Sequence, residues 1–212
     1  MKITAIITAG GTSSRFGNKN KLLEKINGKE IIRYTVEAFE KSDVDEIIIC
    51  ANKSIIEDLQ SMFKHKIIEG GATRQESVYN GIMAADCDFI LIHDGARPVI
   101  TTELINKTIE MVKDKKAVCV MTKTTDTIKE VENGKIIKTI DRTKLYNTQT
   151  PQAFEYNLIK SVHEKLKGEN YTDDSGMAEA LGYEVYVVEG DYGNIKITTQ
   201  SDIAVLKTYL EK

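Results

Sequence analysis

The chain opens with the stretch that decides its fold, Ile3-Thr4-Ala5-Ile6-Ile7-Thr8-Ala9-Gly10-Gly11-Thr12-Ser13-Ser14-Arg15-Phe16-Gly17-Asn18-Lys19-Asn20-Lys21. Its apolar start is too short for a typical helix and predicts a buried strand. The glycines and small hydroxyl residues that follow predict a loop whose backbone N–H groups can approach a phosphate closely. Arg15 and Lys21 add positive charge. Because the stretch lacks the endings of both a P-loop and a G-x-G-x-x-G dinucleotide site, it predicts a phosphate site of a third kind.

Length and composition bound the class of protein. At 212 residues, the chain is long enough for one substantial domain, which we expect to cover residues 1–212. Hydrophobic residues make up 41% and charged residues 29%, values that are typical of a globular protein and exclude a disordered or collagen-like chain. The net charge is −3 with acids and bases interleaved, which argues against a nucleic-acid partner.

The cysteines and the apolar runs predict a cellular location. Cys50, Cys87 and Cys119 lie far apart, in or beside apolar runs, without metal-ligand spacing, so we expect thiols in a reducing compartment. The chain starts on a strand without a leader pattern, and no apolar run approaches the ~20 residues of a membrane helix. The sequence therefore predicts a cytoplasmic protein without a membrane partner.

Short apolar strands alternate with helical periodicity along most of the chain. This alternation predicts an α/β fold with a doubly wound, mostly parallel sheet. The predicted strands cover residues 3–9, 46–51, 66–68, 89–92, 117–121 and 184–188, and the predicted helices cover 30–39, 55–63, 74–84, 102–112, 155–166 and 201–210.

The alternation breaks at residues 125–145. Two arms with period-two alternation, Thr127–Val131 and Ile136–Ile140, surround Asn133-Gly134, which is the strongest short hairpin signal. A two-stranded hairpin is marginal alone, so this β-hairpin arm should pack on something, and a second subunit is one candidate.

Polar clusters follow four of the predicted strands and should meet at one edge of the sheet, where parallel sheets bind ligands. The clusters are the opening loop, Gly70-Gly71-Ala72-Thr73-Arg74 with Ser77, residues 93–97 and residues 193–196. Their one obvious acid is Asp94, whereas their bases are Arg15, Lys21, Arg74, Arg97 and Lys196. A basic pocket in a slightly acidic protein predicts a small, highly anionic ligand such as a nucleoside triphosphate or a sugar phosphate.

Motifs spread over nearly the whole chain occur in the order of a known family. They are Ala9-Gly10-Gly11-x-Ser13-x-Arg15, Asn20-Lys21, Gly70-Gly71-x-x-Arg74-x-x-Ser77-Val78, His93-Asp94-Gly95-Ala96-Arg97-Pro98, Asp126-Thr127-Ile128-Lys129, Gln149-Thr150-Pro151-Gln152, Thr172-Asp173-Asp174 and Asn194-Ile195-Lys196-Ile197-Thr198-Thr199. Together they resemble the 2-C-methyl-D-erythritol 4-phosphate cytidylyltransferases of the non-mevalonate isoprenoid route. Ser13 stands where a second glycine is usual in that family.

The resemblance implies a Rossmann-like nucleotidyltransferase fold and a transfer from CTP to a polyol phosphate with release of pyrophosphate. It also implies Mg²⁺ held mainly by the CTP phosphates, and a homodimer whose hairpin arm reaches the partner's site.

The same resemblance assigns roles to individual residues. Arg15 and Lys21 would hold the reacting phosphates, and Arg142 and Lys196, helped by Thr127, would grip the sugar phosphate. Main-chain groups near Ala9, Gly10, Gly71 and Ala72, with Ser77, would read cytosine, and Asp94 and Arg97 would line the middle of the site. The remaining implied contacts to substrate are Gly11, Arg74 and Gly95.

Simpler interpretations stand beside these roles. Taken alone, Arg142 would be a solvated charge, His93 a hydrogen-bonded histidine at the edge of the core, and His65 and His163 surface residues. Tyr146 and Phe154 would be packing residues. For the whole protein, the alternatives are a ribitol-5-phosphate cytidylyltransferase, which shares most of the motifs, and a non-catalytic nucleotide-binding module.

Overall fold

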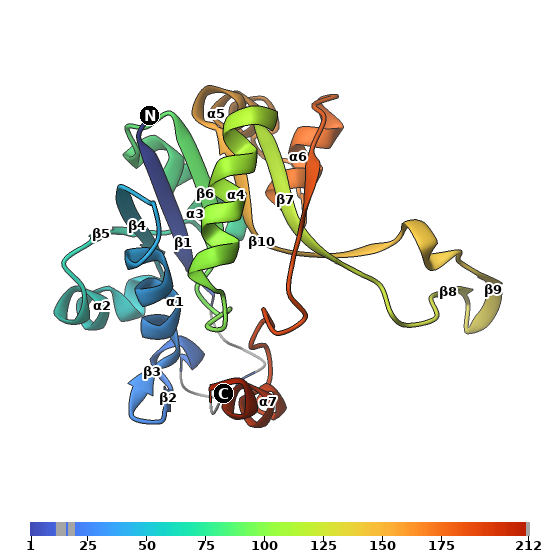
Figure 1. The fold of residues 1–212 in the computed structure, drawn as a ribbon, viewed down its shortest axis with the longest axis horizontal. Coiled ribbons are helices and arrows are strands. Elements are labelled where there is room, and N and C mark those ends of the chain that lie inside the picture. Colours follow the sequence, from blue (N-terminus) through green and yellow to red (C-terminus); the bar gives the residue numbers. More distant parts are fainter. Residues whose placement is uncertain (12–15, 17–19, 211–212) are drawn as a thin grey trace.

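A seven-stranded sheet forms the centre of the computed structural model, which describes residues 1–11, 16 and 20–210 (Figure 1). The strand order is β11-β7-β10-β6-β1-β4-β5, and only β10 runs antiparallel to its neighbours. The strands are β1 (Ile3–Ala9), β4 (Glu46–Ala51), β5 (Lys66–Glu69), β6 (Phe89–Asp94), β7 (Ala117–Lys123), β10 (Tyr146–Glu155) and β11 (Tyr186–Glu189). The chain moves from β1 outward through β4 to β5 and then returns to β6 on the other side of β1, which confirms the doubly wound, mostly parallel sheet.

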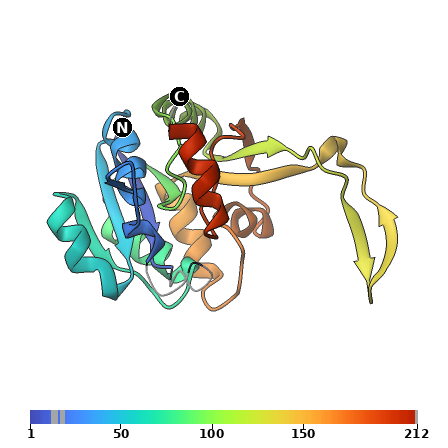
Figure 2. The same cartoon turned by 90° about the horizontal axis from the view of Figure 1, so that it is seen from below.

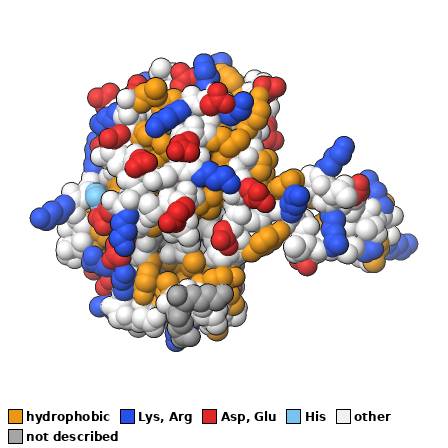
Figure 3. All heavy atoms as spheres, viewed as in Figure 1, with side chains coloured by type: hydrophobic (Ala, Val, Ile, Leu, Met, Phe, Trp, Pro, Cys, Tyr) orange, Lys and Arg blue, Asp and Glu red, His pale blue; other side chains and the backbone are white. Residues whose placement is uncertain are grey.

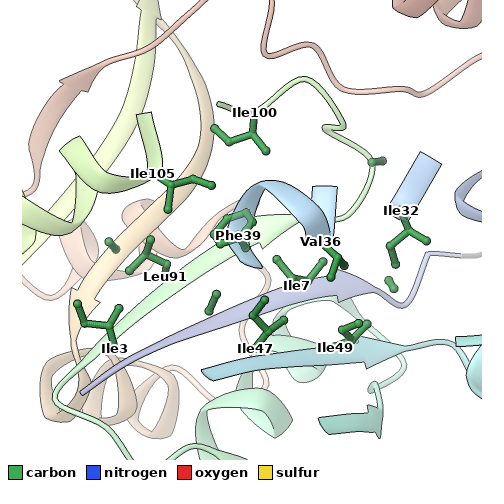
Figure 4. Packing of buried hydrophobic residues seen from close by; sticks show 14 of the residues in the cluster. Ile3, Ile7, Ile32, Val36, Phe39, Ile47, Ile49, Leu91, Ile100 and Ile105 are labelled. Atoms are coloured by element: carbon green, nitrogen blue, oxygen red, sulfur yellow. The ribbon is translucent and has the colours of Figure 1, made fainter. Parts of the chain in front are cut away.

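Helices cover both faces of this sheet. One face packs against α1 (Ile31–Glu40), α2 (Ile56–Met62) and α4 (Thr102–Lys115), and the other against α3 (Arg74–Ala84), α5 (Tyr156–Lys165) and α6 (Asp174–Ala180). Figure 4 shows the first face, where Ile7, Ile49 and Leu91 of the sheet meet Val36 and Phe39 of α1. Because both faces are covered, the parallel strands β1, β4 and β6 are mostly apolar and almost fully buried. None of the helices in the described part is long and apolar enough to cross a membrane.

A smaller apolar cluster lies beside the start of α1. The last helix, α7 (Ser201–Leu210), buries Leu206 there against Phe16, Ile26 and Ile31. Short elements complete this region: η1 (Lys21–Leu23), β2 (Lys25–Ile26) and β3 (Lys29–Glu30). The other single-turn helices are η2 (Lys53–Ile55) and η3 (Arg142–Lys144). The cluster thus brings the C-terminal helix next to residues of the opening stretch.

The predicted hairpin is confirmed as an arm that projects from the body (Figures 1 and 2). Strands β8 (Lys129–Glu132) and β9 (Lys135–Thr139) pair around Asn133 and Gly134. These two residues have φ values of 49° and 78°, the left-handed conformation that a tight hairpin turn requires. Figure 3 shows the arm as a lobe joined to the body by a narrow neck.

Strand β10 is the strand of the central sheet that sequence analysis missed. It lies in the interior of the sheet although it carries Gln149, Thr150, Pro151 and Gln152, residues that are uncommon in a central strand. A break in register between Thr148 and Gln152 admits the proline, which has no N–H for the ladder. The other predicted elements are found, with β11 two residues later at its start than predicted.

Candidate active site

A cavity of about 390 Å³ opens at the carboxyl edge of the sheet, beside the point where the chain order reverses between β1 and β6. This is the place where open parallel sheets bind ligands. Its walls come from the end of β1, the loop after β5, the end of β6 and the segment before α7. The lining residues are Thr8, Ala9, Gly10, Gly11, Lys21, Leu22, Gly71, Ala72, Thr73, Arg74, Ser77, Asp94, Ala96, Lys196 and Thr198.

Most of the residues that the sequence singled out meet in this cavity. They are Ala9, Gly10, Gly11, Lys21, Gly71, Ala72, Arg74, Ser77, Asp94 and Lys196. Gly95, Arg97, Thr127 and Arg142 are not among the lining residues of the described part. Arg15 lies outside the residues that the structure describes.

The loop after β5 is fixed by the first turn of α3. Ser77 is buried, and its Oγ accepts a hydrogen bond from the Gly71 N–H at 3.0 Å and donates to the Thr73 carbonyl at 2.8 Å. The Glu76 carboxylate accepts from the Ala72 N–H at 2.7 Å. A Cβ on Gly70 would lie 2.7 Å from Ser77 Oγ, so this turn needs glycine. Because α3 side chains accept from the amide groups of Gly71 and Ala72, these two donors are not available to a ligand.

Asp94 is the charged centre of the site. Its carboxylate lies 2.8 Å from Lys196 Nζ, 3.5 Å from Arg97 Nε and 3.6 Å from Arg74 Nε. Burial by itself would raise the pKa of Asp94, but Lys196, Arg74 and Arg97 outweigh it and hold the pKa well below its usual range. Asp94 is therefore ionised and holds three cations, of which Arg74 and Lys196 line the cavity.

Residues of strand β10 form hydrogen bonds with the segments that carry Asp94 and Lys196. Thr150 Oγ1 accepts a hydrogen bond from the Asp94 N–H at 3.1 Å and lies 3.0 Å from Nδ1 of the fully buried His93. Burial lowers the pKa of His93 to about 3, so the imidazole is neutral. His93 is thus the hydrogen-bonded residue at the core edge that the sequence predicted. The Asn194 side-chain amide donates to Gln149 Oε1 at 3.2 Å and to the Thr150 carbonyl at 2.9 Å, which ties the Lys196 segment to the same strand.

Gly95 and Arg97 act from behind the cavity rather than in its lining. The Gly95 N–H donates to the Thr8 carbonyl at 3.0 Å, and a Cβ on Gly95 would lie 3.0 Å from that oxygen, so β6 can approach β1 closely only with glycine here. Arg97 Nη1 donates to the Asn194 carbonyl at 2.7 Å. Both residues therefore fix the loop after β6 against neighbouring segments.

The lysines of the site are also anchored. Lys21 Nζ donates to the Ile197 carbonyl at 2.7 Å, and the Ile197 N–H donates to the Ala96 carbonyl at 2.8 Å. The opening stretch, the loop after β6 and the segment before α7 are therefore joined at one point beside the cavity.

The prediction that His163 lies on the surface is wrong. His163 is 2% exposed, because the apolar side of α5 packs on the sheet and carries it inward. Its Nε2 lies 3.0 Å from Asp174 Oδ1, and Asp174 Oδ2 lies 2.8 Å from Arg74 Nη1. Asp174 is thus a second acid beside the site, which was missed because it follows a polar turn rather than a strand; its signal was the run Thr172-Asp173-Asp174.

The structure also tests the simpler interpretations of Phe154, Tyr146 and His65. Phe154 is fully buried, which confirms it as a packing residue, whereas Tyr146 at the root of the arm is 39% exposed in the single chain. His65 lies at the surface beside Glu40, 2.7 Å from its carboxylate.

Thr127 and Arg142 belong to the arm. Both are exposed, and Arg142 donates to the Thr125 carbonyl within the arm. In the single chain, Arg142 is the solvated charge that the simpler interpretation predicted.

Comparisons with known proteins cover the whole of this architecture. The family model described as 2-C-methyl-D-erythritol 4-phosphate cytidylyltransferase matches residues 3–212. A relative of that name from Clostridioides difficile is 41% identical over 98% of this chain and 93% of its own length, and one from Clostridium perfringens is 42% identical over 99% of both chains. Among solved structures, a 4-diphosphocytidyl-2C-methyl-D-erythritol synthase from Anaerococcus prevotii has a TM-score of 0.86, 35% identity and coverage of 100% of this chain and 96% of that one.

Proposed function

Because the chain belongs to the 2-C-methyl-D-erythritol 4-phosphate cytidylyltransferase family, we infer that it joins CTP to 2-C-methyl-D-erythritol 4-phosphate and releases pyrophosphate. The observation that carries this inference is the cavity between β1 and β6, where Lys21, Lys196 and a glycine-lined wall converge. The reaction needs positioning and charge stabilisation more than covalent help, and such a site supplies both.

The bond changes define what the residues must do. An oxygen of the polyol phosphate attacks the α-phosphorus of CTP and forms the new P–O bond. The bond between the α-phosphorus and the oxygen that bridges it to the β-phosphorus breaks, and that oxygen leaves with pyrophosphate. Negative charge grows on the leaving group, so cations beside it lower the barrier. We assign this role to Lys21, which lines the cavity, and by the family pattern to Arg15.

The loop after β5 suits a cytosine base. The amide groups of Gly71 and Ala72 already donate to Ser77 and Glu76, so a base bound here would have to donate to backbone carbonyl groups rather than accept from these two amides. The exocyclic amino group of cytosine is a donor, whereas uracil carries an acceptor there. This wall, together with Ala9 and Gly10 at the end of β1, would therefore favour CTP.

Lys196 is placed for the polyol phosphate. It is the last cation of the segment before α7; its side chain lines the cavity and is 40% exposed. Asp94 holds its ammonium group at 2.8 Å and so fixes where the positive charge stands. A phosphate entering the cavity would then find an oriented cation rather than a mobile one.

We propose that a magnesium ion is held mainly by the nucleotide. Both oxygens of Asp94, the carboxylate that lines the cavity, already face cations, and the described part of the chain contains no group of three metal-binding side chains. The phosphate oxygens of CTP would thus supply most of the ligands. When bound, the ion would neutralise charge on these phosphates.

The arm supports a homodimer with shared sites. Thr127 and Arg142 lie on the arm outside the cavity lining, and the arm exposes the apolar side chains of Ile136 and Ile137, at 66% and 53%. Exposed apolar groups on an extended element are typical of a surface that another chain covers. We propose that the arm of one subunit brings both polar residues to the partner's cavity.

Two broader proposals concern the whole protein. We propose a cytoplasmic location, which the three free cysteines support, and a single nucleotidyltransferase domain, which the one continuous sheet supports. No membrane-spanning helix is found in the described residues.

The role of Lys21 gives a direct test of the active site. Replacing Lys21 with Ala should lower kcat for pyrophosphate release by about 100-fold or more, because a cation is lost where charge develops. Lys53→Ala, which removes an exposed lysine of η2 outside the cavity lining, is the matched control and should keep full turnover. Unchanged turnover of Lys21→Ala would refute the assigned role.

A further inference from the structure

A buried carboxylate stands directly behind the cavity wall without lining it. Asp174, the first residue of α6, is fully buried, and its Oδ2 accepts a hydrogen bond from Arg74 Nη1 at 2.8 Å. Its other oxygen faces His163 Nε2 at 3.0 Å. Arg74 itself is partly exposed and lines the cavity. The ion pair therefore joins the interior of the protein to the wall of the site.

The backbone around Asp174 is held as firmly as its side chain. Gln152 Oε1 accepts hydrogen bonds from the N–H groups of Asp174 and Ser175 at 3.0 and 2.9 Å. Asp173 caps the helix through the Gly176 N–H at 3.2 Å. Since Gln152 belongs to the interior strand β10, the carboxylate is fixed relative to the sheet.

Burying an ionised carboxylate costs free energy unless ion pairs or hydrogen bonds compensate for the lost water. Burial would raise the pKa of Asp174, but Arg74 and His163 outweigh it and keep the pKa below its usual value. A buried ion pair is weak evidence for stability, since apolar residues of similar volume often stabilise a fold as well or better. The pair is better explained by the precise placement of Arg74.

Arg74 stands between two carboxylates. Its Nη1 contacts Asp174, whereas its Nε lies 3.6 Å from Asp94 Oδ1. Asp94 Oδ2 holds Lys196 at 2.8 Å. The shorter contact draws the guanidinium toward α6, so that Asp94 keeps its close contact with Lys196. Arg74 also starts α3 immediately after the loop of Gly71, Ala72 and Thr73, which lines the cavity.

We propose that Asp174 is a positioning residue for the nucleotide: through Arg74 it holds the loop after β5 in its binding geometry and leaves Asp94 to orient Lys196. This inference rests on the proposed function, because it takes CTP as the ligand of the cavity. Asp174 does not touch the substrate; it acts through Arg74.

A double-mutant cycle measures whether Asp174 acts through Arg74. Asp174→Asn keeps the shape of the side chain but removes its charge, and should raise the KM for CTP and weaken CTP binding in calorimetry by about tenfold, with a smaller change in kcat. In an Arg74→Ala background, the same change should alter CTP binding by less than about twofold, because the residue through which it acts is gone. Effects that multiply in the double variant, or an unchanged CTP affinity of Asp174→Asn, would overturn the proposal.

Two further variants guard against a loss of folding. Thr108→Val removes a buried hydrogen bond from α4, far from the cavity lining, and should lower the melting temperature without changing CTP affinity. Should Asp174→Asn fail to fold, Arg74→Lys tests the same link from a partly exposed position, since a lysine cannot bridge both carboxylates; its KM for CTP should rise, and an unchanged KM would contradict the proposal.

Failure of the inference can be separated from failure of the proposed function. Calorimetry with CTP and Mg²⁺ needs no turnover, so it measures the link between Asp174 and Arg74 even if the protein turns over no polyol phosphate. Turnover with normal CTP affinity in every variant would instead uphold the function and reject the link.

Discussion

Three cationic side chains face the buried carboxylate of Asp94. This arrangement fixes their positions before an anionic ligand binds. Lys196, Arg97 and Arg74 would repel one another without this carboxylate. With it, their positions are fixed and part of their charge is balanced, which lowers the reorganisation needed when a triphosphate enters. The chemistry of the site therefore depends on an acid that need not touch the reacting atoms.

Below Asp94, the neutral His93 gives the fold a defined pH dependence. Its pKa is lowered to about 3 by burial, whereas in the unfolded chain it is near the ordinary value of about 6.5. The unfolded state therefore binds one more proton between these values, so the stability contributed by neutral His93 is complete above about pH 6.5 and is lost as pH falls toward 3. We predict a loss of about 2–3 kcal/mol of unfolding free energy between pH 6.5 and 4.5 from this residue.

Denaturant titrations at both pH values check this expectation. His93→Gln should remove that part of the slope, whereas His65→Gln, which changes a histidine at the surface, should retain it. Equal slopes for His93→Gln and the wild-type protein would show that His93 is not the group responsible.

Several residues of the site were accessible to sequence reasoning for a physical reason. Glycines and cations directly after apolar strands are brought together by the geometry of a parallel sheet, as Gly10, Gly71, Asp94 and Lys196 show. Asp174 and His163 were not accessible in this way, because their pairing depends on how α5 and α6 pack against α3.

Among the elements, β10 connects the parts of the site. Gln149, Thr150 and Gln152 contact, respectively, the segment before α7, the end of β6 and the start of α6. The sequence did not reveal this strand because its polar residues and Pro151 contradict the pattern of a central strand. The hairpin arm could be predicted from the sequence because Asn133-Gly134 specifies its turn locally.

The connecting role of β10 predicts an effect of Thr150→Val. The substitution keeps the shape of the side chain but leaves both the Asp94 N–H and His93 Nδ1 without Thr150 Oγ1, which should cost about 1–3 kcal/mol of unfolding free energy. Thr148→Val, at an exposed position of the same strand, should change stability by less than about 0.5 kcal/mol. Equal stability of the two variants in urea unfolding would show that the hydrogen bond contributes little.

At the scale of the whole molecule, the arm leaves the single chain with an incomplete set of implied site residues. Thr127 and Arg142 stand outside the cavity lining, on an element that exposes apolar side chains to solvent. A partner subunit would both cover these side chains and receive the two polar residues. The hairpin could be predicted from the sequence alone, because Asn133-Gly134 specifies its turn locally, whereas no local pattern indicates what covers its exposed side chains.

Mixed dimers test this arrangement. Arg142→Ala and Lys21→Ala chains should each be poorly active alone, whereas a purified mixed dimer should regain up to about half of the wild-type activity, because one of its two sites then has both residues. Verified mixed dimers without any recovery would show that the arm does not serve the partner's site.

The most direct test of the proposed function is to determine which polyol phosphate the protein joins to CTP. The protein should be incubated with CTP, Mg²⁺ and either 2-C-methyl-D-erythritol 4-phosphate or ribitol 5-phosphate, with pyrophosphate release followed in time and the products identified by mass spectrometry. We predict rapid release and a CDP-linked methylerythritol with the first compound, and little reaction with the second. Turnover of ribitol 5-phosphate alone, or CTP binding without turnover of either compound, would contradict the proposed function.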